Sequence, residues 1–138
     1  MTDFLIFEVQ DGVATITMNR PEKLNAFTSE MLHGLVAALD ECEDREDVRT
    51  VILTGAGRGF SSGGDIGGMG EENDSRPHIT KTRIWEEIQA FAKRAARFEK
   101  PLLAAVNGAA IGGAGGIAFD IWGRAGLTAS KNPMRIPI

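Results

Sequence analysis

Two glycine-rich stretches each follow directly on a short apolar run, and their backbone could do chemistry. "TGAGRGFSSGGDIGGMG" covers residues 54–70 and begins after "VIL", and "NGAAIGGAGG" covers residues 107–116 and begins after "LLAAV". Each glycine costs about 0.5–1 kcal/mol in conformational freedom relative to alanine, so the repetition calls for a compensating role. Glycine turns between a strand and a helix expose free N–H groups beside the positive end of the helix dipole. Two such donors from separate turns predict a site for an oxyanion.

The glycines also admit other interpretations. A phosphate-binding loop requires G-x-x-x-x-G-K-[ST], and neither stretch has Gly-Lys followed by Ser or Thr. A dinucleotide-binding pattern, G-x-G-x-x-A, is present at Gly113, Gly115 and Ala118, but the acid expected about 20 positions later is absent, because no acid follows Asp120. The third interpretation is structural, since glycines permit tight turns and close packing. Each stretch alone favours that third interpretation, whereas two stretches at two strand ends favour a site.

Composition narrows the class of protein. The chain has 138 residues, which predicts one domain or part of one, and a formal net charge of −4, which argues against nucleic acid as a partner. Cys42 is the single cysteine, so no intrachain disulfide forms and a reducing, cytoplasmic setting is expected. No apolar run approaches the length of a membrane span, and the first residues lack the pattern of a signal peptide.

The apolar patterning predicts the elements that position the two stretches. Asp11-Gly12 lies between two β-rich runs and predicts a hairpin, and Thr28 or Ser29 is expected to cap a helix whose apolar residues recur at helical spacing. The predicted elements after the two strands and this helix are a strand over 50–54, a helix over 79–98, a strand over 101–106 and a short helix over 113–119. The order β-β-α-β-α-β-α predicts an α/β fold.

Some side chains have ordinary structural interpretations. Cys42 is expected in the core face of the first helix, and His33 is expected on its solvent side. Trp85 is expected to pack rather than to bind a ligand.

Three blocks in order resemble the enoyl-CoA hydratase/isomerase, or crotonase, superfamily. They read "VATITMNRPEKLNAF", "VRTVILTGAGRGFSSGGDI" and "FEKPLLAAVNGAAIGGAGG", and the resemblance covers about residues 5–118. It implies an α/β, crotonase-like (ClpP/crotonase) spiral of ββα units, truncated and lacking the C-terminal helical region. On this basis residues 1–120 are expected to form the N-terminal core, and residues 121–138 an atypical or truncated tail.

The resemblance implies a site built on two main-chain amides. Gly64, in "FSSGGDI", and Gly113, in "NGAAIGGAGG", match the positions whose N–H groups form an oxyanion hole for a thioester enolate. The positions implied to contact the substrate, an acyl-CoA thioester, are Lys23 and Ala26 in the coenzyme A turn and Ser62, Asp65, Ile66 and Gly67 in the first glycine stretch. From the residues alone, Asp65 is better explained as a helix cap than as a catalytic group. Arg20, Lys23 and Arg58 are candidates to meet the phosphates of coenzyme A.

The chain departs from the family pattern at the acids. The first glutamate used by hydratases lies three residues after the second oxyanion-hole glycine, and here that position is Gly116. The second lies in a following loop, and the matching region "KNPMRIPI" has no glutamate. Two hypotheses stay open: an enzyme of enoyl-CoA hydratase/isomerase type, or a catalytically inactive module that binds coenzyme A or a partner subunit.

The resemblance also bears on cofactors and partners. Coenzyme A is expected only as part of the substrate, with no separate cofactor and no metal. No nucleic acid or membrane partner is expected. The full-length family members are expected to be homo-oligomers, trimers or hexamers, and to serve fatty acid metabolism.

Overall fold

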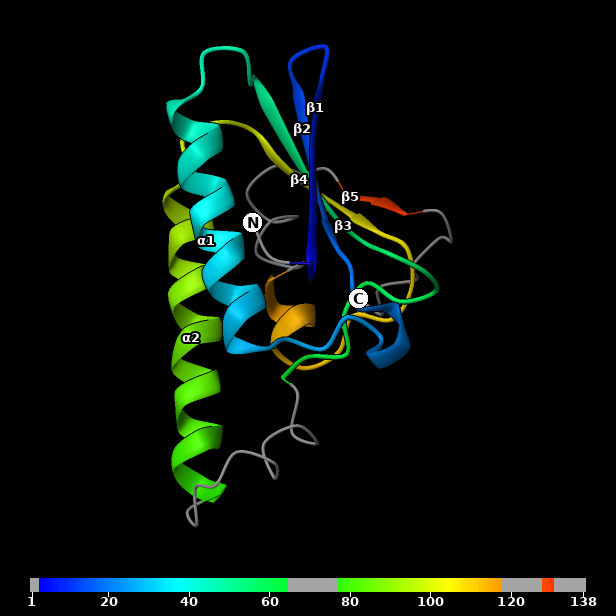
Figure 1. The fold of residues 1–138 in the computed structure, drawn as a ribbon, viewed down its shortest axis with the longest axis vertical. Helices are drawn as coiled ribbons and strands as arrows, with labels where there is room; N and C mark the ends of the chain where they lie inside the picture. Colours follow the sequence, from blue (N-terminus) through cyan, green and yellow to red (C-terminus); the bar gives the residue numbers. More distant parts are fainter. Residues whose placement is uncertain (1–2, 65–76, 118–127, 131–138) are drawn as a thin grey trace.

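A computed structural model describes residues 3–64, 77–117 and 128–130 of the chain. Five strands form one sheet, with two long helices beside it (Figure 1). In chain order the elements are β1 (Leu5–Gln10), β2 (Val13–Met18), the 3-10 helix η1 (Pro21–Lys23), α1 (Ser29–Asp44), β3 (Thr50–Gly55), α2 (Pro77–Arg97), β4 (Leu102–Val106) and β5 (Thr128–Ser130). A further helical turn covers residues 113–117.

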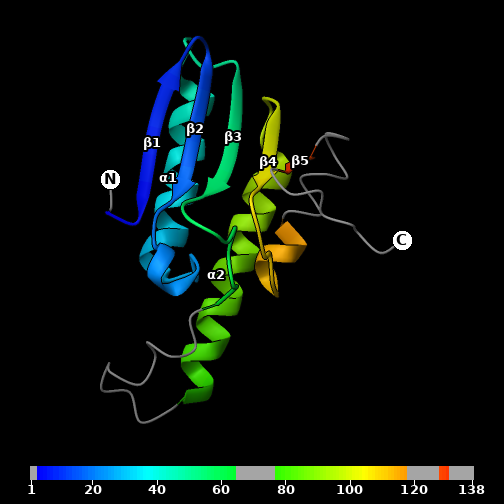
Figure 2. The ribbon, with the colours of Figure 1, turned by 90° about the vertical axis from the view of Figure 1, so that its right-hand side faces the viewer.

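The sheet has the strand order β1-β2-β3-β4-β5. The β1–β2 pair is antiparallel and closes at a tight turn where Asp11 and Gly12 have φ values of 53° and 82°. The pairs β2–β3, β3–β4 and β4–β5 are parallel. The carboxyl ends of β2, β3 and β4 therefore lie at one edge of the sheet, where β2 leads into the turn with η1 and β3 and β4 lead into the glycine-rich loops (Figure 2).

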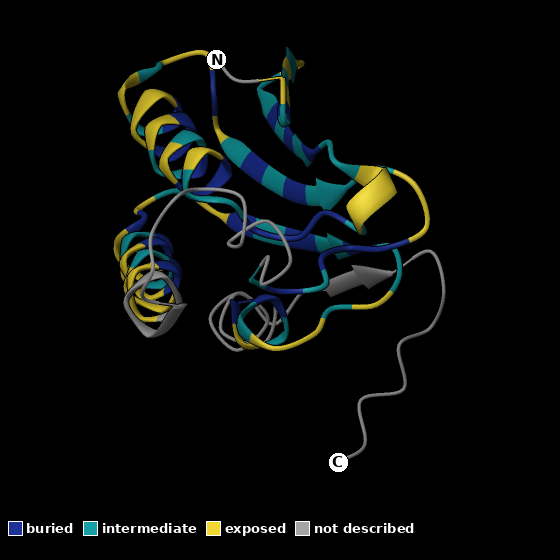
Figure 3. Cartoon of the chain, turned by 60° about the horizontal axis from the view of Figure 1, so that its bottom comes forward, coloured by how far each residue is buried: buried dark blue, intermediate teal, exposed yellow. Residues whose placement is uncertain are grey.

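The helices α1 and α2 pack side by side against the sheet (Figures 1 and 2). The N-terminus of α1 is capped by Thr28, whose Oγ1 accepts a hydrogen bond of 3.1 Å from the N–H of Met31. Buried residues lie where helices and strands meet, and exposed residues lie on the outer surfaces of α1 and α2 and on η1 (Figure 3). The largest fully buried side chains are Phe27, Phe60, Phe91, Phe98, Ile16, Met18, Met31, Leu32, Leu35, Leu39, Val48 and Val51.

Polar contacts fix the C-terminal end of α1. The ammonium group of Lys100 donates to the carbonyl oxygens of Cys42, Arg45 and Val48 at 2.6, 2.7 and 2.8 Å. These carbonyls lie at or just beyond the end of α1, where helical carbonyls lack intrahelical donors, so a cation from the approach to β4 stabilises this end.

Most of the predicted elements are confirmed. The hairpin, both long helices, the strands at 50–55 and 102–106 and the start of a helix at residue 113 lie where the sequence predicts them, and Cys42 is fully buried. The strand β5 was not predicted, because three residues carry too little pattern for a period of two to be detected. The expectation for Trp85 is wrong: its side chain is 55% exposed, because it lies one position beyond the buried Ile84. No helix in the described segments is long and apolar enough to cross a bilayer.

Candidate functional site

The two glycine-rich stretches are joined by main-chain hydrogen bonds. The N–H of Ser61 donates to the carbonyl of Ala109 at 3.1 Å, and the N–H of Ile111 donates to the carbonyl of Ser61 at 3.0 Å, which forms a short parallel bridge between Ser61 and Ala110. Gly63 lies so close to the carbonyl oxygen of Ile111 that an added Cβ would be 2.8 Å from it. Segments about fifty residues apart in the sequence therefore form one unit at the edge of the sheet.

Gly64 and Gly113 lie against the same side chain of α2. A Cβ added at Gly64 would be 3.7 Å from Cδ1 of Ile88, and a Cβ added at Gly113 would be 3.3 Å from that atom and 2.8 Å from Cγ2. The two Cβ positions can therefore be no further apart than the sum of their distances to Cδ1 of Ile88, 3.7 and 3.3 Å. The structure therefore brings the two predicted site glycines together, and a side chain at Gly113 would require Ile88 to shift.

The N–H groups of both glycines are without an acceptor in the part of the chain that the structure describes. The carbonyl of Gly63, in the same peptide unit as the Gly64 N–H, accepts a bond of 2.7 Å from Phe27, so the Gly64 N–H points away from Phe27 across a trans peptide. The carbonyl of Gly112 accepts from Gly116 at 3.2 Å, so the Gly113 N–H points out of the first turn of its helix. Gly64 and Gly113 are both half-buried residues.

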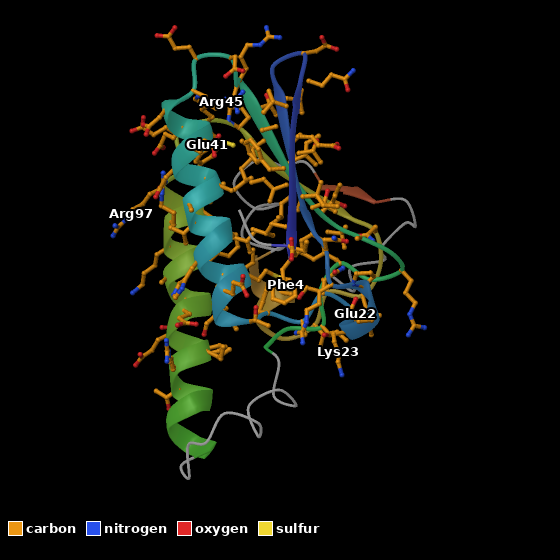
Figure 4. All side chains as sticks on the ribbon, viewed as in Figure 1. Phe4, Glu22, Lys23, Glu41, Arg45 and Arg97 are labelled. Atoms are coloured by element: carbon orange, nitrogen blue, oxygen red, sulfur yellow. The ribbon has the colours of Figure 1, made fainter. Side chains whose placement is uncertain are left out.

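The predicted coenzyme A turn is attached to the first glycine stretch. Ser62 donates through its N–H to the carbonyl of Leu24 at 2.9 Å and through its hydroxyl to the carbonyl of Lys23 at 3.3 Å. Ala26 is buried, whereas Lys23 is exposed on η1, at the end of the molecule opposite Arg45 (Figure 4). The structure therefore places Lys23, Ala26 and Ser62 beside the segment that carries Gly64.

Several further residues that the sequence singled out are exposed or lie outside the described residues. Asp65, Ile66 and Gly67, with the proposed cap role of Asp65, lie outside the described residues. Gly116 is exposed, and a Cβ added there would meet no described atom within 4 Å. His33 is exposed, as expected, and its Nε2 lies 3.5 Å from Glu87 on α2.

Asn25 is a buried residue that the sequence analysis missed. Its side-chain N–H groups donate to the carbonyls of Ala56 and Gly59, both at 2.9 Å, and its Oδ1 accepts from the N–H of Arg20 at 2.7 Å. The residue is fully buried and has φ of 55°, a conformation that asparagine tolerates better than most residues. The sequence signal that could have identified it is an asparagine at the end of a polar turn, directly before the apolar Ala26 and Phe27.

Asn107 holds the same loop from the other side. Its side-chain N–H groups donate to the carbonyls of Gly57 and Gly59 at 2.9 and 3.2 Å, and its Oδ1 accepts from the N–H of Gly55 at 3.2 Å. Two asparagines thus satisfy polar backbone groups of the loop that leads from β3 to Gly64, and the buried side chain of Phe60 adds apolar packing in the same loop.

Glu87 is an acid of α2 that lies next to Ile88 in the chain. Among the described residues its buried Oε2 has no hydrogen-bond partner, and its Oε1 lies 3.3 Å from Nε of Arg83 and 3.5 Å from Nε2 of His33. These contacts place its carboxylate between α1 and α2. The structure gives no contact between Glu87 and either glycine, although Glu87 directly precedes Ile88 in the chain.

The side chains with shifted pKa values lie on or near α1 and α2, away from the glycine pair. Burial raises the pKa of the Cys42 thiol to about 11. At the C-terminal end of α1, a hydrogen bond from Arg45 lowers the pKa of the exposed Asp47 carboxyl. Hydrogen bonds to Asp40 and Glu43 raise the pKa of Arg94, which joins α2 to α1. These groups stabilise the helices and do not contact the glycine pair.

Comparison with known proteins identifies the family. The family model described as enoyl-CoA hydratase/isomerase matches residues 8–122. A solved structure of an enoyl-CoA hydratase/isomerase from Xanthobacter autotrophicus Py2 superposes with a TM-score of 0.81 at 33% identity, covering 94% of this chain and 46% of that one. The chain therefore has the crotonase fold, α/β with a mixed sheet, and it belongs to the enoyl-CoA hydratase/isomerase family.

Curated relatives differ in what their names say they do. The 1,2-epoxyphenylacetyl-CoA isomerase of Escherichia coli K12 is 35% identical over 119 residues, which cover 86% of this chain and 45% of that protein. The small ribosomal subunit protein mS47 of Schizosaccharomyces pombe is 32% identical over 125 residues, covering 86% of this chain and 28% of that protein. The chain spans about half the length of most relatives it matches, or less.

Proposed function

We propose that this chain binds an acyl-CoA thioester and holds its carbonyl oxygen between the N–H groups of Gly64 and Gly113. The single observation that carries the proposal is that both glycines lie against Ile88 while their N–H groups lack acceptors in the described part of the chain. Two preorganised donors stabilise negative charge that develops on a carbonyl oxygen, and one such donor typically contributes ~3–4 kcal/mol to a transition state. Such charge develops when the α-carbon loses a proton or a nucleophile adds at the β-carbon.

The surroundings of the glycine pair support a coenzyme A thioester in particular. The turn that carries Lys23 and Ala26 is hydrogen-bonded to the segment before Gly64, so a nucleotide held at the turn would be anchored close to the amides. Lys23, Arg20 and Arg58 are the proposed partners of its phosphates, and Ser62, Asp65, Ile66 and Gly67 the proposed contacts along the thioester. Coenzyme A enters as part of the substrate, without a separate cofactor.

The proposal extends to the setting of the protein. A role in fatty acid metabolism in the cytoplasm fits an acyl-CoA ligand and a single, buried cysteine. Assembly into a homotrimer or hexamer is proposed for the full-length form, by analogy with the family.

A thioester and a thioether of equal length test the role of the carbonyl. We expect the 138-residue chain to bind crotonyl-CoA at least about tenfold more tightly than the matching alkyl-CoA thioether, because only the thioester presents an oxygen to the two amides; a tenfold ratio corresponds to 1.4 kcal/mol. Isothermal titration calorimetry measures both affinities, with free coenzyme A as the reference. Equal affinities for thioester and thioether would refute the oxyanion site.

A second candidate function is a catalytically inactive module that binds coenzyme A or a partner subunit. It is favoured by Gly116, which has no titratable group where a hydratase glutamate is expected, and by a relative named as a ribosomal subunit protein. An assay of crotonyl-CoA hydration separates the two candidates. The reaction is monitored as the decrease in absorbance of the enoyl group. Sustained turnover by this chain would exclude the inactive module, and thioester binding without turnover would support it.

A further inference from the structure

Ser61 joins three segments of the site through hydrogen bonds of both its backbone and its side chain. It is fully buried. Its N–H and C=O bond to Ala109 and Ile111 of the second glycine stretch at 3.1 and 3.0 Å. Its hydroxyl donates to the carbonyl of Asn25 at 2.7 Å and accepts from the N–H of Gly63 at 3.2 Å.

The hydroxyl of Ser61 acts on the peptide units next to Gly64. Gly63 has φ of 91°, a conformation available mainly to glycine, and it is held at its N–H by Ser61 and at its carbonyl by Phe27 at 2.7 Å. Because the Gly63 carbonyl and the Gly64 N–H share one planar peptide unit, fixing Gly63 on both sides fixes the direction of the Gly64 N–H.

We propose that the hydroxyl of Ser61 is a positioning group that aligns the Gly64 N–H with the Gly113 N–H and connects this alignment to the turn at Asn25. The inference rests on the proposed oxyanion site and deepens it. Ser61 touches no substrate in this scheme. Its backbone fixes the distance between the two glycine stretches, and its hydroxyl fixes the orientation of one of the two donors. A ligand held at the turn would thereby meet a preorganised amide.

The free protein tests the hydrogen bond by itself. In Ser61→Ala, the amide hydrogen of Gly63 loses its acceptor, and we expect its exchange with solvent to become roughly tenfold faster or more, as measured by NMR. The matched control is Thr54→Val, which removes another hydroxyl that donates to a backbone carbonyl, that of Ala105 at 2.8 Å, but lies in the sheet. Unchanged exchange at Gly63 in Ser61→Ala would overturn the proposal without any reference to a ligand.

A chromophoric ligand tests the alignment. Hydrogen bonds to the carbonyl oxygen polarise a conjugated aryl-enoyl-CoA thioester, so we expect its absorbance to move to longer wavelength when it binds the unaltered chain. At a saturating concentration of the ligand, Ser61→Ala should lose at least half of this spectral shift. Ser61→Thr, which keeps the hydroxyl, and Thr54→Val should retain the shift. Thermal unfolding confirms that each variant is folded, and a Ser61→Cys variant replaces Ser61→Ala if that variant does not fold.

The outcomes separate this inference from the proposed function. If the unaltered chain gives no spectral shift, the oxyanion site itself fails, and the role of Ser61 fails with it. If the unaltered chain gives the shift and Ser61→Ala gives an equal one, the oxyanion site stands and Ser61 is only structural. A lost shift in Ser61→Ala, restored in Ser61→Thr, supports the positioning role.

Discussion

The helix–sheet core and the glycine-rich edge of the sheet are held by different forces. In the core, apolar side chains of α1, α2 and the strands exclude water from one another, and Leu35 and Phe91 are 1% exposed. At the edge, three polar side chains, those of Asn25, Ser61 and Asn107, hydrogen-bond to carbonyl and N–H groups of neighbouring loops. The stability of the core therefore depends on how well apolar side chains fill its volume. The conformation of the glycine-rich edge depends on the positions of individual polar atoms.

The difference determines how each region responds to change. A core tolerates apolar exchange when the volume is kept, since the hydrophobic effect has no direction. A loop fixed by hydrogen bonds fails when one partner is lost, because the other is left buried and unsatisfied. A site for an oxyanion needs the second kind of structure, since its donors must keep one direction.

Gly108→Ala is expected to have the largest effect, because the added Cβ would overlap the backbone carbonyl oxygen of Arg58 and would lie 3.1 Å from Cα of Gly59. Neither backbone can move without breaking the contacts of the loop, so we expect a loss of roughly 3 kcal/mol or more in the free energy of unfolding. Gly116→Ala is the matched control, since its Cβ would meet nothing. Urea denaturation measures both, and equal stabilities would show that the edge is plastic.

Leu35→Ala and Asn25→Ala compare the two regions directly. Leu35→Ala leaves a cavity in the core and should cost roughly 3 kcal/mol. Asn25→Ala removes three side-chain hydrogen bonds and should cost roughly 2–3 kcal/mol. Only Asn25→Ala should also reduce the preference for a thioester over a thioether, measured by calorimetry at a temperature where both variants are folded. An equal loss of preference in Leu35→Ala would contradict the separation of the two regions.

Lys100→Met tests a polar contact that serves the core instead of the edge. The methionine keeps the length of the side chain but cannot donate to the carbonyls of Cys42, Arg45 and Val48, so we expect a loss of roughly 2 kcal/mol in unfolding free energy. Ligand preference should be unchanged, because these carbonyls lie at the C-terminal end of α1. Lys100→Arg, which keeps the charge, serves as the partial rescue in the same denaturation experiment.

Cys42 gives the smallest effect and a pH dependence. Its pKa is about 11 in the folded chain against an ordinary value of 9.0, because burial disfavours the thiolate. The folded state therefore holds this proton more tightly, so its contribution to stability is fully present below about pH 9 and is lost as the pH rises toward 11. Cys42→Ala should remove this part of the pH dependence in thermal unfolding between pH 8 and pH 11. At pH 8, alkylation of the folded chain should be slow compared with that of the chain in urea.

The amino-acid sequence by itself determined every element except η1 and β5, and their order. Apolar residues at helical spacing identified α1 and α2, short apolar runs identified β3 and β4, and Asp11-Gly12 between two β-rich runs identified the hairpin, because each of these signals is local in the sequence. The sequence also indicated Gly64 and Gly113, through the glycine-rich strand ends and the family resemblance. It missed the exposure of Trp85, because propensity does not reveal which helical positions lie at the margin of a core.

Only the tertiary structure decided how the two glycine-rich stretches contact each other. Three sets of interactions join segments that are far apart in the chain. They are the approach of both glycines to Ile88, the bridge between Ser61 and Ala110, and the hydrogen bonds of Asn25 and Asn107 to the loop after β3. No local pattern encodes such contacts, because a hydrogen bond between two loops depends on where the sheet places both of them. Periodicity thus predicted the buried faces of the two long helices, and the folded backbone decided which polar atoms meet.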